Sequence, residues 1–123
     1  MSGNKAFGKR IRELREAKRQ TDPSYSLRQF ADKLDVSPTF LSKVEIGDFD
    51  PPSAEKIKKM AELLGVDADE LLALAKKPNP ELIGIIQESP KAFADLLRVA
   101  KSSGLTAEDI QKLTEQIRKG KKP

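Results

Sequence analysis

The side chains best suited to chemistry in this sequence are polar groups on a short predicted helix that follows Ser37. Thr39 and Ser42 carry hydroxyls that donate and accept hydrogen bonds, and Lys43 carries an ammonium that only donates. A second short helix and a tight turn precede them within residues 26–47, at a spacing that the major groove of DNA can accept. These groups offer hydrogen bonding to a polar partner.

Catalytic chemistry lacks its usual side chains here. The sequence has no histidine, no cysteine and no glycine-rich phosphate loop, and its carboxylates fall on exposed helix faces or at helix starts. We therefore predict that the protein is not an enzyme and has no metal, cofactor or disulfide. A metal site made of carboxylates alone is the remaining alternative.

Composition indicates a folded protein with a modest positive charge. The 123 residues, 34% charged and 37% hydrophobic, suit one compact domain with a small appendage. No apolar run reaches about 18 residues and no signal peptide is present, so we expect no membrane partner and a cytoplasmic, nucleoid-associated protein. The net charge is +4, yet residues 26–76 carry seven basic against ten acidic side chains. Contacts with an anionic partner must therefore come from a few well-placed groups.

The polar helix needs neighbours that hold it in place, and the hydrophobic spacing predicts them. A first helix is expected from about Phe7 to Arg19, followed by a loop over residues 20–25. Ser26 is the predicted N-cap of the next helix, with Gln29 completing a capping box. The buried stripe of this helix comprises Leu27, Phe30, Ala31 and Leu34.

The turn between the two short helices is predicted at Asp35 and Val36. Ser37 is the expected N-cap of the polar helix, Pro38 is its first residue and Gly47 ends it. After a loop over residues 48–52, Ser53 and Asp67 begin two more helices. The sequence thus predicts five helices by about residue 76.

Four segments in this order resemble the lambda-repressor-like helix-turn-helix family, also called the Cro/cI or Xre type. They read RIRELRE, LRQFADKLDVS, LSKVEIG and PPSAEKIKKMAELLGVDADEL, and the resemblance covers roughly residues 7–75. It implies an all-α fold with a five-helix DNA-binding domain at residues 1–76 and the motif at 26–47. The partner that it implies is a double-stranded DNA operator.

The resemblance also implies roles for individual residues. Base contacts would come from Pro38, Thr39, Ser42 and Lys43. Contacts with phosphates of the DNA backbone would come from Arg10, Ser26, Leu27, Arg28 and Ser37. Structural support would come from Ala31, from Gly47 and from a pair between Arg15 and Glu45. For Arg10, an ordinary solvated surface is an equal alternative.

Three features depart from the family pattern. Asp35 replaces the glycine usual in the turn, and the loop at residues 20–25 is about five residues longer than usual. That insertion has three interpretations: contact with DNA, contact with a partner, or a tolerated insertion, the last being favoured. After Gly47 the chain reads Asp48-Phe49-Asp50, where many relatives place a lysine or arginine that contacts a phosphate. This suggests that Lys56, Lys58 or Lys59 makes the phosphate contact instead.

Residues 77–119 predict a small three-helix C-terminal domain, with helix starts at Pro80, Pro90 and Thr106. About forty residues rarely sustain a core alone. We therefore expect dimerisation with a second copy, and docking onto the first domain is the alternative. The expected dimerisation residues are Leu82, Ile83, Ile86, Phe93, Leu96, Leu97, Ile110 and Leu113. Residues 120–123 form a basic tail.

The sequence as a whole favours a bacterial or phage transcription regulator. We expect a homodimeric repressor whose two heads bind half-sites roughly 34 Å apart in the major groove. The alternative is an antitoxin or anti-regulator that acts through its C-terminal helices. A protein partner or a protease would then control it.

Overall fold

The computed structural model describes residues 3–120, in which helices are connected by turns and loops and no strand is present. The all-α prediction is confirmed. The chain divides into two compact units, Met1–Pro80 and Glu81–Pro123, each of which is described by itself. Within residues 3–120, no helix has the length and apolar character needed to cross a membrane. Most of the predicted basic tail lies outside the described residues.

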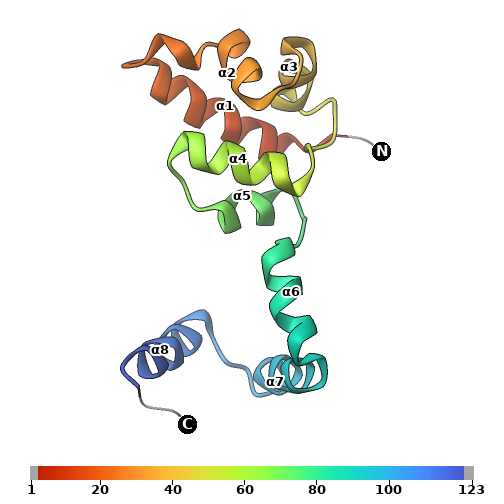
Figure 1. Ribbon diagram of the computed structural model, residues 1–123, viewed down its shortest axis with the longest axis vertical. Helices are drawn as coiled ribbons and strands as arrows, with labels where there is room; N and C mark the ends of the chain where they lie inside the picture. The colour runs from red at the N-terminus through yellow and green to blue at the C-terminus, as the bar shows by residue number, and fades with distance from the viewer. Residues whose placement is uncertain (1–2, 121–123) are drawn as a thin grey trace. The chain divides into compact units, whose positions relative to one another are not determined.

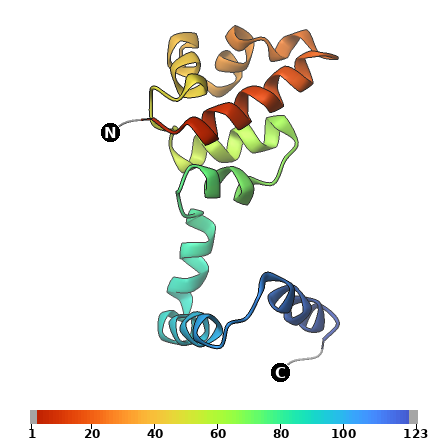
Figure 2. The same cartoon turned by 180° about the vertical axis from the view of Figure 1, so that it is seen from behind.

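The first unit contains the five expected α helices and one additional short helix. They are α1 (Lys5–Arg19), the 3-10 helix η1 (Pro23–Tyr25), α2 (Leu27–Leu34), α3 (Pro38–Ile46), α4 (Ala54–Leu64) and α5 (Ala68–Leu74). Both ribbon views show α1 running between the α2–α3 pair and the α4–α5 pair (Figures 1 and 2). The polar helix α3 is therefore held by α1 and α2.

One hydrophobic core joins these helices. Its buried members are Phe7, Ile11, Tyr25, Phe30, Ala31, Leu34, Leu41, Val44, Ile57, Met60, Ala61, Leu64, Leu71, Leu72 and Ala75. They recur at spacings of three and four along each helix, as one buried face requires. Leu14 and Leu27 pack against this core from partly buried positions.

The α helices of the first unit begin at capping side chains. The caps are Asn4, Ser26, Ser37, Ser53 and Asp67, each accepting a hydrogen bond from a backbone N–H of its own first turn. Because Asn4 caps α1, that helix starts at Lys5, two residues before the predicted start. The capping box predicted for Ser26 and Gln29 is half formed, since the Ser26 N–H donates instead to the Pro23 carbonyl at 3.2 Å.

The insertion at residues 20–25 was predicted as a loop, but it folds onto the first unit. Residues 23–25 form η1, and the Tyr25 ring is buried with its hydroxyl donating to the Leu63 carbonyl at 2.8 Å. The Asp22 carboxylate accepts from the hydroxyl and the N–H of Ser24, and these hydrogen bonds lower the pKa of Asp22. The insertion is thus a packed element.

The second unit contains three helices at the expected starts. They are α6 (Pro80–Glu88), α7 (Pro90–Ser102) and α8 (Ala107–Arg118), and α8 begins with a complete capping box between Thr106 and Asp109. None of these three helices has a buried residue. Most of their large apolar side chains are exposed, whereas Ile86 and Phe93 are partly buried.

Candidate nucleic-acid interface

The turn between α2 and α3 is fixed from both sides. Asp35 adopts the left-handed conformation (φ 57°, ψ 46°), and the Val36 N–H donates to the Ala31 carbonyl at 3.0 Å. From α4, the Lys56 ammonium donates to the Leu34 carbonyl at 2.6 Å. Lys56 therefore caps the end of α2, whereas Lys58 and Lys59 are exposed.

Helix α3 turns its polar side chains away from the core. Thr39 is exposed, and Ser42 and Lys43 are half-buried, while Leu41 and Val44 are buried on the inner face. This outward row of Thr39, Ser42 and Lys43 is called the polar row below. Donors and acceptors of this kind match the base edges of a major groove.

Gly47 ends α3 in a conformation that favours glycine. Its φ is 85°, and an added Cβ would lie 2.6 Å from the Lys5 Cγ atom. Pro38 and Ser37, at the other end of the helix, are both exposed, and the Ser37 hydroxyl accepts from the Phe40 N–H at 3.0 Å. The length and ends of α3 are thus set by local backbone chemistry.

Helix α1 approaches α3 very closely at Gly8. A Cβ at this position would lie 2.2 Å from the Val44 carbonyl oxygen and 2.6 Å from that of Glu45. Gly8 was not singled out from the sequence. Its spacing from the buried Ile11 and Arg15 was the available signal, because a glycine on the buried side of a helix often marks a close approach.

Arg15 and Glu45 form a buried bidentate pair between α1 and α3. The Arg15 Nε atom donates to Glu45 Oε2 at 2.7 Å and Nη2 donates to Oε1 at 2.9 Å. The Tyr25 carbonyl accepts a further hydrogen bond from Nη1 at 3.2 Å. The hydrogen bond with Glu45 raises the pKa of Arg15, outweighing the effect of burial. The insertion thus completes the support of α3.

Several proposed backbone-contact residues surround one surface hollow. It is lined by Arg19, Ser26, Leu27, Arg28 and Pro38, at the N-terminal ends of α2 and α3. Two guanidinium groups beside a helix N-terminus suit a phosphate, and that of Arg19 also lies 3.4 Å from the Glu16 carboxylate. Arg19 was missed by sequence reasoning, since the insertion separates it from the motif and only folding brings it there.

Arg10 is not among these residues. Its Nη2 atom lies 3.4 Å from the Glu70 carboxylate of α5. The Arg10 side chain therefore lies beside α5, whereas Arg28 lies at the start of α2. Both interpretations of Arg10, a phosphate contact and an ordinary solvated surface, stay predictions.

Two short helices across a tight turn, the second carrying an outward polar row, define the fold of a helix-turn-helix DNA-binding regulator. Residues 6–74, more than half of the chain, match the sequence model described as a helix-turn-helix domain, and the chain belongs to that family. The resemblance drawn from residues 7–75 is confirmed.

Other comparisons give weaker likenesses. No curated protein matches the chain. The crystal structure of the clp gene regulator ClgR from Corynebacterium glutamicum is 27% identical, with a TM-score of 0.48, over 84% of this chain and 95% of that one. A chain of the SinR/SinI protein complex is 23% identical, with a TM-score of 0.47, over 94% of this chain and 97% of that one.

Proposed function

We propose that this protein is a sequence-specific, double-stranded DNA-binding transcription regulator that acts as a homodimeric repressor. The observation that carries the proposal is the outward polar row on α3 beside the cationic hollow at the start of α2. Together, the row and the hollow provide groups for base edges and groups for phosphates, the two kinds of contact that DNA recognition requires.

The proposed contacts follow from this arrangement. The polar row of Thr39, Ser42 and Lys43, with Pro38 at its start, faces the bases. Ser26, Leu27, Arg28, Ser37 and the newly found Arg19 position the domain on the phosphates. Arg15, Ala31, Glu45 and Gly47 hold the helices in register and touch no DNA.

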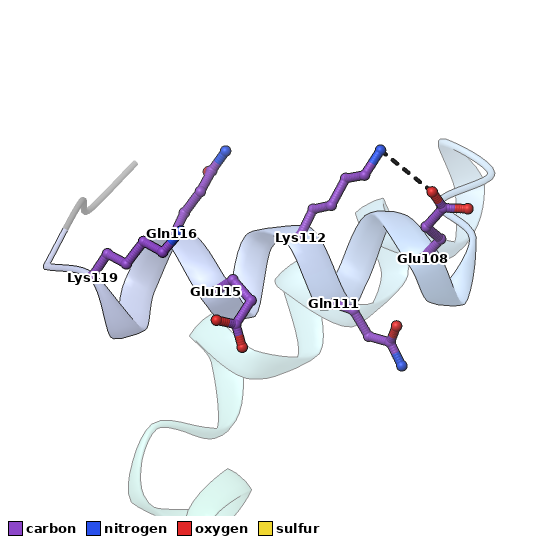
Figure 3. A pocket seen from close by; sticks show the side chains of 6 residues that line it. All are labelled: Glu108, Gln111, Lys112, Glu115, Gln116 and Lys119. Atoms are coloured by element: carbon purple, nitrogen blue, oxygen red, sulfur yellow. Dashed lines mark ion pairs between the residues drawn. The ribbon is translucent and has the colours of Figure 1, made fainter.

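Dimerisation is supported by the apolar side chains of the second unit. Leu96, Leu97 and Ile117 are each more than half exposed, and none of α6, α7 and α8 has a buried residue. Figure 3 shows six polar side chains along α8, including Lys112 and Glu108, which form an ion pair at 3.5 Å. Because α8 also carries Ile110, Leu113 and Ile117, it is amphipathic, and a second copy covers its apolar side.

A compact domain on a promoter blocks polymerase without further machinery, which favours repression. The same exposed apolar helices support a second candidate, an antitoxin or anti-regulator in which α6, α7 and α8 bind a different protein. In that case, partner binding or a protease acting on the second unit controls the protein.

Selection from random oligonucleotides with the purified chain tests the proposal. We expect enrichment of a two-fold symmetric motif, bound more weakly as salt concentration rises. Absence of any enriched motif contradicts sequence-specific binding and favours the interaction role. Enrichment of a single unpaired half-site contradicts the homodimer.

A further inference from the structure

Lys43, the cation of the polar row, has a carboxylate beside it. Its Nζ atom lies 3.8 Å from Asp48 Oδ2, and both side chains are about half exposed. Asp48 belongs to the acidic segment that follows α3, where many relatives of the family have a lysine or arginine. The pair thus joins the candidate base contact to the feature that most departs from the family pattern.

The backbone keeps this carboxylate next to the ammonium. The N–H groups of Asp48 and Phe49 both donate to the carbonyl of Lys43, at 2.9 and 3.2 Å. Gly47 provides the left-handed turn that makes these bonds possible. The position of Asp48 is therefore set by the end of α3, independently of DNA.

The pair affects phosphate and base contacts differently. A lysine binds a phosphate as a point charge and releases a counterion, so a neighbouring carboxylate cancels much of that attraction and is itself repelled. A base edge offers neutral, directional acceptors. Since 3.8 Å is longer than a hydrogen bond, the ion pair leaves the ammonium donors available for such acceptors.

We propose that Asp48 is a specificity-determining residue that orients Lys43 toward base edges and suppresses its contact with phosphates. This inference rests on the proposed function and deepens it. Restricting Lys43 before binding lowers the entropy lost when it meets a base. In the acidic surroundings of α3, Asp48 thus lowers affinity for DNA in general and preserves affinity for the correct site.

The same loop contains a matched control. Asp50 is two residues away, and its Oδ1 atom accepts from the Gly3 N–H at 2.8 Å. Asp50→Asn removes one negative charge, and the amide oxygen can keep that hydrogen bond. Asp48→Asn removes the same charge together with the ion pair to Lys43, so comparing the two separates the pair from the loop charge.

The test measures binding of the full chain to its selected duplex and to a shuffled duplex of equal length, by fluorescence anisotropy across salt concentrations. For Asp48→Asn we expect about fivefold tighter binding to the shuffled duplex and a smaller gain on the selected one. On the shuffled duplex, the slope of log affinity against log salt steepens by about one. In a chain that already carries Lys43→Gln, we expect Asp48→Asn to leave the ratio of the affinities for the selected and the shuffled duplex unchanged.

Equal gains on both duplexes for Asp48→Asn and Asp50→Asn overturn the inference, because the loop charge alone then explains them. So does an unchanged salt slope. A wild-type chain that selects no DNA overturns the proposed function and this inference with it. The first two results require a wild-type chain that binds its selected duplex, so the two failures are distinguishable.

Discussion

Lys43 is the residue whose removal best separates base recognition from phosphate binding. It is the cation of the polar row and lies half-buried on the outer side of α3. We expect Lys43→Ala to cost about 1 to 3 kcal/mol on the selected duplex and to relax the preference at one base position. Repeating the selection with the variant measures both effects.

Lys58→Ala is the control for that experiment. Lys58 is an exposed lysine of α4, so its removal makes the same change in net charge away from the polar row. We expect it to leave the selected motif intact, and any affinity lost through a phosphate contact of Lys58 to be lost equally on all sequences. If Lys43→Ala lowered the affinity equally for all DNA sequences, Lys43 would contact only phosphate.

The Arg15–Glu45 pair is a second test at the scale of single residues. Arg15→Ala leaves the Glu45 carboxylate, whose side chain is 4% exposed, without its bidentate partner. A buried charge that loses its mate costs about 3 to 5 kcal/mol, which urea unfolding of the full chain can measure.

Replacing both members should cost less than the sum of the single changes. Arg15→Met with Glu45→Met removes both charges and leaves side chains of similar size. Strictly additive costs for the two single changes would mean that the pair contributes no coupling energy.

The sequence alone could predict only some of the residues that form and support the candidate DNA interface. The pair between Arg15 and Glu45 was predicted because the family resemblance aligns both positions. The Tyr25 carbonyl, the Lys56 cap and the position of Arg19 depend on contacts between distant segments, which no local pattern encodes. Asp48 was noticed as a departure, but its partner appears only in the folded chain.

At the scale of elements, the contact of α1 with α3 depends on one glycine. Helix propensity alone predicts that Gly8→Ala stabilises α1 by about 1 kcal/mol. The structure predicts the opposite, because the added Cβ would lie 2.2 Å from the rigid Val44 carbonyl. We expect a lower midpoint in thermal unfolding, together with weaker DNA binding because α3 shifts.

Gly84→Ala provides the matched control for that substitution. Gly84 is also inside a helix, α6, but an added Cβ there meets nothing within 4 Å. We expect it to leave the unfolding midpoint unchanged or raise it. A stabilising Gly8→Ala would show that α1 and α3 can separate without cost.

The start of α8 should depend on pH. The Thr106 N–H donates to the Asp109 carboxylate at 3.0 Å, which lowers the pKa of Asp109 below its ordinary value of 3.8. A lowered pKa in the folded state means that the stabilisation is present above 3.8 and is lost as pH falls through the lowered value. The protection factors of the amides in the first turn of α8, taken relative to the intrinsic exchange rate at each pH, should therefore fall there in wild type, with less change in Asp109→Asn.

Helix starts could be predicted from the sequence because their determinants are local. Serine, aspartate or threonine caps and prolines lie within one turn of the N–H groups or backbone positions that they affect. The insertion was misjudged because the burial of Tyr25 depends on Leu63 of α4, far along the chain. The half-formed capping box at Ser26 has the same cause, since the insertion supplies the competing Pro23 carbonyl.

At the scale of the whole molecule, the two units differ in how they treat apolar side chains. The first buries Phe7, Phe30 and Leu41 completely in one core, whereas no residue of α6, α7 or α8 is buried. A unit of about forty residues with uncovered apolar faces needs a partner to be stable. We therefore expect the second unit to depend on a partner for its stability and the first unit not to.

We expect the wild-type chain to be a dimer in sedimentation equilibrium at micromolar concentration. Leu96→Glu with Leu97→Glu, at two positions more than half exposed on α7, should make it monomeric. The monomer should bind the two-fold operator about a hundredfold or more weakly, because two linked heads raise the effective concentration at the second half-site. Gln111→Glu, on the polar side of α8 in Figure 3, should change neither property. A monomeric wild-type chain that still binds the operator cooperatively would show that DNA, not α6, α7 and α8, assembles the two heads.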